Sequence, residues 1–348
     1  MIKCGIIGCG VIAPTHLAGY KAIPGVEVTH FCDLEISRAE KLSAGMPGVR
    51  CFTDYREMLQ DKELTAVSIC TDHASHAAIF CDAIAAGKHV ICEKVPGRTH
   101  EDLVRMLDTA AQYPEIVATG IFQHRFNPGN IALQNLIREK KFGKLLNVNL
   151  NFACLRTDEY YSLSPWRGTA AGEGGGVLIN QAIHFLDQLR FLFGDFRRIA
   201  AVSANRTHQQ VMEVEDTVAF AAELTNGIFV TVTATNSALT RWRSALTICG
   251  TGGQAEFIDE KLAYLEVADP EEDAAIRKAL ENPAEDLQVN GKAYYGTGHT
   301  AQLTDFIQAI REKRPPQLSL AEAANSAALV QSVYAAAASG QWIDVYRF

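Results

Sequence analysis

The sequence GCGVIA at residues 8–13 has a glycine spacing that suits phosphate binding. It follows a short apolar stretch and precedes a helical pattern. Gly8 permits a tight turn, Gly10 lets the backbone approach a pyrophosphate, and the small Ala13 allows a helix to pack closely on a strand. The N–H groups at the start of that helix attract anions. We therefore expect a dinucleotide to contact Gly8, Gly10, Val11 and Ile12.

An acidic residue stands where the ribose of such a dinucleotide is expected. Asp33 ends the second apolar stretch, and an acid about 20 residues after the glycines accepts hydrogen bonds from the ribose hydroxyls of NAD. The alternative is a plain glycine turn with an aspartate that caps the helix before Ser37. Arg38 is close enough in sequence to meet a 2′-phosphate. NAD is therefore the predicted cofactor, and NADP stays possible.

Polar residues follow two later apolar stretches, each of which ends in a cysteine. Thr71 and His76 come after the first, and Glu93 and Lys94 come after the second. Ligands bind at the carboxyl ends of strands in open α/β sheets, so these four residues are candidates for the cofactor site, and Lys94 is expected to face the nicotinamide. Two alternatives remain open: His76 starts a helix without touching a cofactor, and Glu93 and Lys94 form a solvated pair.

A third group begins with the three glycines at 174–176 and continues as a helical pattern. Asn180, His184 and Asp187 recur at i, i+4 and i+7, which places them on one helix face. A histidine on such a face is often only a core residue, but the glycine-rich entrance favours a site. A neutral imidazole accepts a proton near pH 7. No metal is expected, because His184 and Asp187 are two possible ligands without a third.

Aromatic and cationic residues precede those glycines. Such side chains stack on sugar-like rings and form hydrogen bonds with hydroxyl groups, although the aromatic ones are also compatible with a plain core. The residues expected to contact a substrate are Tyr160, Trp166, Arg167 and Asn180.

The elements that must position these residues form two different patterns. Over the first 120 residues, short apolar runs alternate with helical stretches, which predicts a doubly wound parallel sheet. The expected strands are Lys3–Ile7, Val26–Phe31, Ala66–Cys70, His89–Cys92 and Ile116–Thr119. The expected helices are His16–Ala22, Ser37–Ala44, Tyr55–Gln60, His76–Ala86 and Glu101–Gln112.

After Gly120 a helix at about Asn130–Lys140 leads into alternating segments, so an α+β domain with a large, mainly antiparallel and open sheet is predicted. Asn226-Gly227 is a strong hairpin signal. Strands are expected at Leu145–Ala153, Ile199–Asn205, Thr217–Leu224, Ile228–Thr235 and Ala245–Cys249, and helices at about Thr300–Ala338 with a break at Arg314-Pro315-Pro316. The predicted domains are a dinucleotide-binding domain at 1–122 and a substrate-binding and oligomerisation domain at 123–348.

The amino-acid composition limits the classes of partner that the protein is expected to bind. The 348 residues carry 40 acidic and 32 basic side chains, for a formal charge of -8, which argues against nucleic acid and membrane surfaces and favours a small molecule. Nine cysteines are an odd number without C-x-x-C spacing, which indicates free thiols in a reducing cytoplasm. Alternating apolar residues in 219–224 and 229–234 suggest that the open sheet face forms a homodimer or homotetramer.

Three motifs together resemble the Gfo/Idh/MocA oxidoreductase family: G-x-G-x-x-A, the E-K-V-P turn at residues 93–96, and the G-G-x-x-x-N-x-x-x-H pattern that ends at His184. The resemblance covers essentially the whole chain, including QHRFNP at 123–128, and implies that Gln123 joins the cofactor site. It implies a Rossmann domain, a substrate domain with an open sheet, and hydride transfer between NAD(P) and a hydroxyl of a sugar or cyclitol. The family's lysine, aspartate and histidine correspond to Lys94, Asn180 and His184.

Two positions depart from the family pattern. Val95 follows the lysine and moves the proline to Pro96, so the expected cis X-Pro bond is shifted or lost. Asn180 replaces the usual aspartate and cannot act as a base, which leaves His184 as the proton acceptor and Lys94 as the group that stabilises the alkoxide. Some family branches with an Asn-Gln pair here act on nucleotide-linked or glycosidic sugars.

The predicted activity is that of an NAD(P)-dependent dehydrogenase acting on a secondary hydroxyl of a sugar derivative or cyclitol. One alternative is a glycoside-cleaving enzyme that oxidises its substrate transiently, eliminates the glycosidic bond and regenerates its NAD. A third possibility is a dinucleotide-binding protein without catalysis, for which Asn180 and Val95 are the only arguments.

Overall fold

The computed structural model describes residues 1–281 and 298–348, which form two compact units. The first unit consists of residues 1–123 and 298–327 with Phe348, and the second of residues 124–281 and 328–347. The contacts thus divide the chain one residue after the predicted boundary. They also group 298–327 with the first unit, although the sequence analysis assigned this segment to the second domain.

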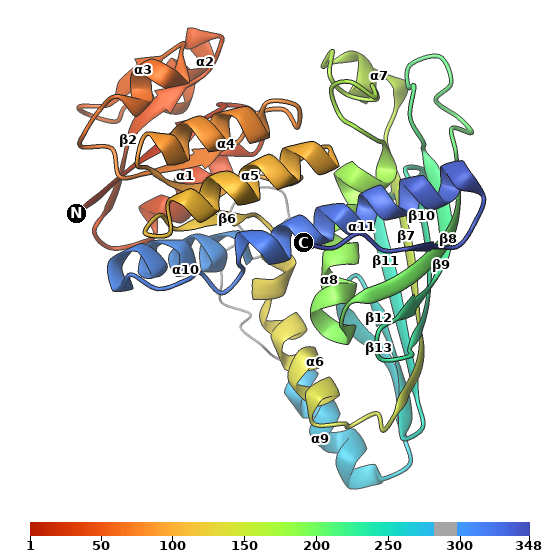
Figure 1. The fold of residues 1–348 in the computed structure, drawn as a ribbon. Helices are drawn as coiled ribbons and strands as arrows, with labels where there is room; N and C mark the ends of the chain where they lie inside the picture. The colour runs from red at the N-terminus through yellow and green to blue at the C-terminus, as the bar shows by residue number, and fades with distance from the viewer. Residues whose placement is uncertain (282–297) are drawn as a thin grey trace. The chain divides into compact units, whose positions relative to one another are not determined.

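The first unit, whose N-terminal part is coloured red to orange in Figure 1, is built on a six-stranded parallel sheet in the order β3-β2-β1-β4-β5-β6. Its order reverses between β1 and β4, and ligands bind at such a switch point. The predicted doubly wound sheet is confirmed, with the short β3 in addition. The strands are β1 (Ile2–Ile7), β2 (Val26–Cys32), β3 (Arg50–Phe52), β4 (Ala66–Ile69), β5 (His89–Cys92) and β6 (Ala118–Gly120).

Two separate cores cover the two faces of this sheet. The helices are α1 (Ala13–Lys21), α2 (Ile36–Leu42), α3 (Tyr55–Leu59), α4 (His76–Ala85), α5 (His100–Gln112) and α10 (Gly298–Glu312). Leu303 and Phe306 of α10 are fully buried in the core that includes β1 and α1. A Cβ on Gly19 would lie 2.6 Å from Leu303 Cδ1, so the glycine permits the close approach of α1 and α10. This burial explains why α10 belongs to the first unit.

The second unit holds an eight-stranded sheet in the order β13-β12-β11-β7-β10-β9-β8-β14. Only β7 and β10 pair in parallel among its described neighbours, so the predicted mainly antiparallel sheet is confirmed. Asn226-Gly227 does connect two antiparallel strands. The strands are β7 (Leu145–Leu155), β8 (Phe196–Ala204), β9 (Thr217–Leu224), β10 (Phe229–Thr235), β11 (Ser237–Gly250), β12 (Gly253–Ile258), β13 (Lys261–Val267) and β14 (Ile343–Asp344).

One face of this sheet is buried by helices. Phe152 of β7 and Phe185 of α8 meet with ring centroids 5.0 Å apart. The helical segments are α6 (Pro128–Arg138), α7 (Asp158–Ser162), a π-helical turn at Leu178–Ala182, α8 (Ile183–Phe193) and α9 (Pro270–Glu281), preceded by the 3₁₀ turn Gln123–Phe126. The long helix α11 (Leu320–Ser339) is shared, because its residues up to Ala327 group with the first unit.

The opposite sheet face carries small and polar side chains. The row Val202, Ala219, Thr233, Asn151 and Ala245 runs across five paired strands. The alternating apolar residues that motivated the prediction of an apolar open face are instead the buried ones, such as Val230, Val232, Phe220 and Leu224. Period-two alternation identifies an apolar face but not what covers it; here the chain's own helices do.

Within residues 1–281 and 298–348, no helix has the length and apolar character that crossing a membrane requires.

Candidate active site

The glycine loop between β1 and α1 is shaped for a bound phosphate group. Gly8 has φ +89°, and a Cβ there would lie 2.6 Å from the carbonyl carbon of Cys70. A Cβ on Gly10 would meet nothing within 4 Å, so space remains beside the loop. Ile12 precedes α1, and its side chain has no polar atom with which to cap the first N–H groups. The loop therefore leaves room for a pyrophosphate beside the N-terminus of α1.

Asp33 lies at the edge of this loop. Its Oδ2 accepts a hydrogen bond from the Cys9 N–H at 2.8 Å, and its Oδ1 accepts one from the Glu35 N–H at 2.9 Å. Each carboxylate oxygen can accept more than one hydrogen bond, so ribose hydroxyls can share this group. Arg38 is on the surface and forms a bidentate pair with Glu35 at 2.8 and 3.0 Å, an arrangement that favours NAD over NADP.

Asp33→Ala is expected to weaken NAD binding by about 10- to 100-fold, because hydrogen bonds to a charged partner are worth about 1.5–3 kcal/mol. NADP should lose much less affinity, since the variant also removes repulsion of the 2′-phosphate. Calorimetric titration of both cofactors measures the change, with Arg38→Ala as the matched control. An unchanged ratio of the two affinities would remove Asp33 from the ribose site.

A buried carboxylate, that of Glu93, holds the turn that follows β5. Glu93 is 6% exposed; its Oε1 lies 2.9 Å from His16 Nε2, and its Oε2 accepts a hydrogen bond from the Lys94 N–H at 3.1 Å. His299 Nε2 of α10 lies 3.7 Å from the same Oε1. Burial acts to raise the pKa of Glu93, but the contacts with His16 and His299 outweigh it and hold that pKa well below its ordinary value. Glu93 is thus a buried anion that fixes the turn, not half of a solvated pair.

The turn itself carries a cis peptide bond between Lys94 and Val95, so the cis bond precedes valine rather than Pro96. His76 is fully buried, with Nδ1 2.7 Å from the Val95 carbonyl oxygen and Nε2 3.3 Å from that of Thr71. Burial lowers its pKa, and a neutral imidazole donates through only one nitrogen, so the shorter contact is the hydrogen bond. His76 therefore braces the turn against α4, as the alternative interpretation of the sequence allowed.

The end of the sheet nearest this turn carries two further candidates. The Thr71 hydroxyl accepts a hydrogen bond from Ser75 Oγ at 2.7 Å. Gln123 is 2% exposed, and no donor among residues 1–281 and 298–348 contacts its Oε1. A buried acceptor without a partner costs about 1–3 kcal/mol, and an amide group of a bound nicotinamide would satisfy it. The fit of a dinucleotide thus rests on the space at Gly10 and on the Gln123 acceptor.

In the second unit, the three glycines open the helical segment by close packing. A Cβ on Gly176 would lie 1.8 Å from the Glu215 carbonyl oxygen, and one on Gly175 would lie 2.1 Å from the Tyr334 hydroxyl. The Glu215 carboxylate accepts hydrogen bonds from the N–H groups of Gly176 and Leu178 at 2.9 and 3.1 Å. Burial raises the pKa of this carboxyl. Glu215 therefore caps the segment that carries Asn180 and His184.

Asn180 lies beside a carboxylate that the sequence analysis did not identify. Its Nδ2 donates to Glu173 Oε1 and, at 3.4 Å, to the Tyr160 hydroxyl. Glu173 is 1% exposed, and its Oε2 accepts a hydrogen bond from the Gly168 N–H at 2.5 Å. The guanidinium of Arg167 lies over the Tyr160 ring, 4.3 Å from its centroid. These contacts bring together Asn180, Tyr160 and Arg167, and Trp166 joins them at 5.6 Å from the Arg167 guanidinium carbon.

The predicted helix face is altered by the π-helical turn. Asn180 lies within that turn and His184 follows it; such turns widen the helix and recur at functional sites. Asn180 and His184 are partly exposed, whereas Asp187 is fully buried. Asp187 accepts from Arg125 Nε at 2.8 Å and from its Nη2 at 2.7 Å. Asp187 is therefore a structural anchor, and the predicted common face of the three residues divides in two.

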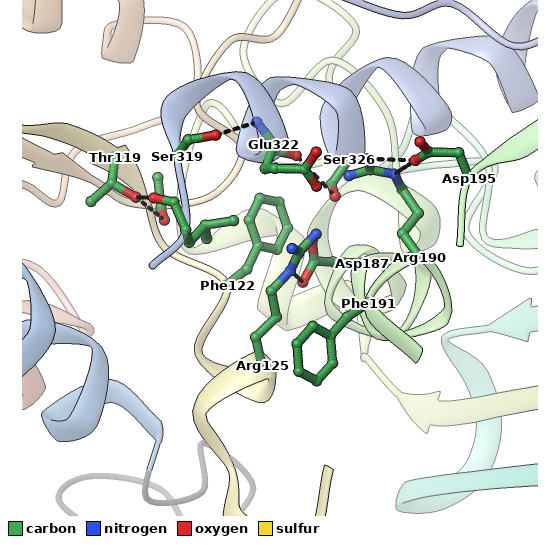
Figure 2. A network of polar contacts seen from close by, with 12 residues as sticks. Thr119, Phe122, Arg125, Asp187, Arg190, Phe191, Asp195, Ser319, Glu322 and Ser326 are labelled. Atoms are coloured by element: carbon green, nitrogen blue, oxygen red, sulfur yellow. Dashed lines mark hydrogen bonds and ion pairs between the residues drawn. The ribbon is translucent and has the colours of Figure 1, made fainter. Parts of the chain in front are cut away.

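Figure 2 shows Arg125 beside both the Asp187 carboxylate and the ring of Phe191, whose centroid is 5.6 Å away. The side chain of Arg125 is 12% exposed, and that of Asp187 is fully buried. Asp187→Ala should lower the free energy of unfolding by about 3–5 kcal/mol, because it strands a buried cation. Urea denaturation measures the loss. Glu35→Ala, which breaks the exposed pair with Arg38, should cost about 0–1 kcal/mol; equal losses would contradict this account.

Each unit thus carries its own set of predicted residues. The first unit holds Gly8, Gly10, Val11, Ile12, Asp33, Arg38, Thr71, His76, Glu93, Lys94 and Gln123, and the second holds Tyr160, Trp166, Arg167, Asn180 and His184. Three further residues were not predicted: Glu173, although it directly precedes the three glycines, and His16 and His299, whose partner Glu93 is far away in sequence. No group of three His, Cys, Asp or Glu side chains suited to a metal ion occurs in the described ranges.

Comparisons with known proteins agree with this arrangement. Residues 2–121 match the family model described as "Oxidoreductase family, NAD-binding Rossmann fold", and residues 134–345 match "Oxidoreductase family, C-terminal alpha/beta domain". Levoglucosan dehydrogenase of Pseudarthrobacter phenanthrenivorans is 26% identical over 99% of this chain and 98% of its own. Inositol 2-dehydrogenase of Salmonella typhimurium is 24% identical over 90% of this chain and 88% of its own.

A solved structure extends the likeness to the fold. The WlbA dehydrogenase from Bordetella pertussis, crystallised with NADH and UDP-GlcNAcA, has a TM-score of 0.88 and 25% identity, and the match covers 100% of this chain and 98% of that one. The predicted resemblance is confirmed over both units. The chain belongs to the Gfo/Idh/MocA oxidoreductase family and carries that family's NAD-binding Rossmann fold.

Proposed function

We propose that this oxidoreductase transfers a hydride between NAD and a secondary hydroxyl of a sugar derivative or cyclitol. The similar proteins named above are dehydrogenases of levoglucosan and inositol, and the WlbA structure holds a nucleotide-linked sugar acid. The single observation that carries the proposal is the cluster of Tyr160, Arg167, Asn180 and Glu173. It combines an aromatic face, a cation, one amide and a carboxylate, which is the chemistry that recognises polyhydroxylated rings.

The cofactor would be held by the first unit. The loop that begins at Gly8 would hold the pyrophosphate through the N–H groups of Gly10, Val11 and Ile12, Asp33 would accept from the ribose, and Gln123 would accept from the nicotinamide amide. When bound, NAD supplies the acceptor for the hydride that leaves the carbinol carbon.

The proton and the developing charge are handled by two residues. His184 accepts the hydroxyl proton as the carbon–hydrogen bond breaks and the carbonyl forms. Lys94 donates a hydrogen bond to the reacting oxygen and stabilises the negative charge that develops on it. Asn180 cannot take up a proton, and its amide is held by Glu173, so it orients the ring. Tyr160, Trp166 and Arg167 support the same orientation.

The test is whether NADH accumulates. The enzyme is incubated with NAD and a panel of pyranoses, glycosides, nucleotide sugars and cyclitols, and absorbance at 340 nm is followed. The proposal expects NADH in many-fold excess over enzyme with at least one of them. Release of a glycosidic leaving group with NADH held at or below one equivalent would instead indicate cleavage with NAD recycling. NAD binding without any turnover would indicate a non-catalytic protein.

We also propose that the open sheet face associates with a second copy of the chain, giving a homodimer or homotetramer. The face presents flat rows of small side chains, and Phe229 there is 61% exposed. Thr233→Arg should convert the assembly to a monomer in light scattering at micromolar concentration, whereas Gln209→Arg, on an exposed loop, should leave its mass unchanged. A monomeric parent protein would overturn this proposal.

We infer a cytoplasmic location, since the structure keeps all nine cysteines as free thiols and free buried thiols are typical of reducing compartments. Fractionation of the native host with antibodies against the chain tests it.

A further inference from the structure

The ring of His184 is stacked on a second imidazole. The centroids of His124 and His184 are 5.2 Å apart, with an angle of 10° between the ring planes. His124 is 3% exposed and lies in the 3₁₀ turn that precedes α6. The Phe185 ring packs against it in an edge-to-face arrangement, with the ring centroids 5.4 Å apart. The two rings are thus held parallel, with His124 buried and His184 partly exposed.

A carboxylate from a turn that is distant in sequence contacts the His124 ring. His124 Nδ1 lies 3.1 Å from Glu260 Oε1, at ion-pair distance, although the contact does not meet the geometry of a regular hydrogen bond. Asn130 Nδ2 donates to the same Oε1 at 2.8 Å, and Asn127 and Gln188 reach the carboxylate at 3.4 Å. Three amide groups therefore hold Glu260 against His124.

The backbone at Glu260 is unfavourable for a glutamate. Asp259 and Glu260 form the two-residue turn between β12 and β13, with φ of 51° and 63°. Turns with positive φ at both central positions favour Asn-Gly or Asp-Gly, since glycine alone adopts the second position without cost. A side chain retained at a strained position points to a function for that side chain.

The contact with Glu260 favours a positive charge on His124. Burial lowers the pKa of His124, but the carboxylates of Glu260 and Asp187 outweigh it and the net shift is upward. Two other charged side chains of α8 have partners: Asp187 is paired with Arg125, and Arg190 with Asp195 at 2.7 Å. The ring that stacks on His184 is therefore the one whose cationic form Glu260 stabilises.

We propose that His124 and Glu260 are positioning residues that hold a cation against the His184 ring and thereby favour its neutral, proton-accepting form. The inference rests on the proposed role of His184 as the base. A positive charge at stacking distance disfavours a second one, so His184 stays deprotonated to lower pH than an isolated imidazole would. The parallel stack also fixes the plane in which the His184 nitrogens accept a proton.

His124→Gln removes the cation and leaves the Glu260 anion. The pKa of His184 should then rise by about one unit or more, the usual effect of a nearby charge. Glu260→Gln deprives His124 of its counter-ion, so the buried ring becomes neutral, and the pKa of His184 should rise by a smaller amount. In both variants the acidic limb of kcat/KM for oxidation should move to higher pH by the same amount as the His184 pKa.

The measurement is a pH titration of the histidine Cε1–H resonances of the full chain by NMR, with His184 assigned by its loss in His184→Gln, together with pH–rate profiles of each variant. His208→Gln is the matched control, since His208 is also paired with a carboxylate in the second unit, 2.6 Å from Asp158. It should leave the His184 titration unchanged. Glu260 lies on a half-exposed turn, so Glu260→Gln keeps the test informative if His124→Gln does not fold.

An unmoved or lowered His184 pKa in both variants would overturn the inference, even if His184→Gln abolishes the acidic limb. An acidic limb that persists in His184→Gln would instead overturn the role of His184 as base. In that case the NMR titration still decides whether His124 and Glu260 control the protonation of His184.

Discussion

His184→Gln is expected to lower the turnover of oxidation by about 10²–10⁴-fold, the usual contribution of a general base. Glutamine keeps the size of the side chain but cannot take up the hydroxyl proton. Because Asn180 cannot take it up either, no neighbouring group on the same helical segment replaces His184. NAD affinity should stay near that of the parent protein, since the glycine loop and Asp33 belong to the first unit. Stopped-flow turnover and equilibrium NAD binding measure the two quantities.

The pH profile separates this assignment from its competitor. With His184 as base, the parent enzyme loses oxidation activity below an apparent pKa within a few units of 6.5, the ordinary histidine value, because the imidazolium cannot accept a proton. Lys94→Ala should lower turnover as well, since it removes stabilisation of the alkoxide, but the acidic limb should remain. An acidic limb that persists in His184→Gln and disappears in Lys94→Ala would assign the base role to a lysine of depressed pKa.

Gly10→Val should abolish NAD binding, with a loss of affinity of at least about 100-fold, while the fold survives. The space beside Gly10 is empty to 4 Å, so a branched side chain meets no protein atom there but occupies the region that the pyrophosphate needs. Equilibrium binding and thermal unfolding without cofactor measure the two effects. Normal NAD affinity in a folded Gly10→Val would show that the loop does not bind the pyrophosphate.

Gly8→Val is the matched control, because its expected effect is on the stability of the fold, whereas that of Gly10→Val is on NAD affinity. A Cβ at Gly8 would lie 2.6 Å from backbone atoms of Cys70, and its φ of +89° disfavours any side chain. This variant should therefore unfold at a lower temperature than the parent protein even without cofactor. Equal thermal stability of the two variants would contradict the geometry of the loop.

Local patterns in the sequence were sufficient to predict the parts of the fold in which strands and helices alternate regularly or a turn motif marks where a strand ends. The alternation of β1, β2, β4, β5 and β6 with helices and the Asn226-Gly227 hairpin are local signals, and both are confirmed; the short β3 was not predicted. The turn between β12 and β13 gave no such signal, because Asp259-Glu260 lacks the glycine that marks its type. The helix α10 was predicted as a helix, but an amphipathic pattern does not say which core buries its apolar face.

The candidate site was predictable where its residues share a motif and unpredictable where they meet across the sequence. Gly8, Gly10 and Asp33 follow from spacing around one strand pair. Glu260 and His299, by contrast, contact residues more than a hundred positions away, and only the tertiary fold specifies such contacts. Asp187 matched a helical period, but its partner Arg125 comes from another segment and holds it in a buried ion pair.

The placement of α10 bears on the order in which the chain acquires structure during synthesis. Leu303, Phe306 and Ile307 complete the core that contains β1 and α1, yet the ribosome adds them only after most of the second unit. Domains commonly fold in order as they emerge, whereas here the earliest strands must wait for a segment about 300 residues further along the chain. The second unit also waits, because it includes residues 328–347, and a nascent chain that stops near residue 123 leaves the apolar surface that α10 buries exposed to chaperones.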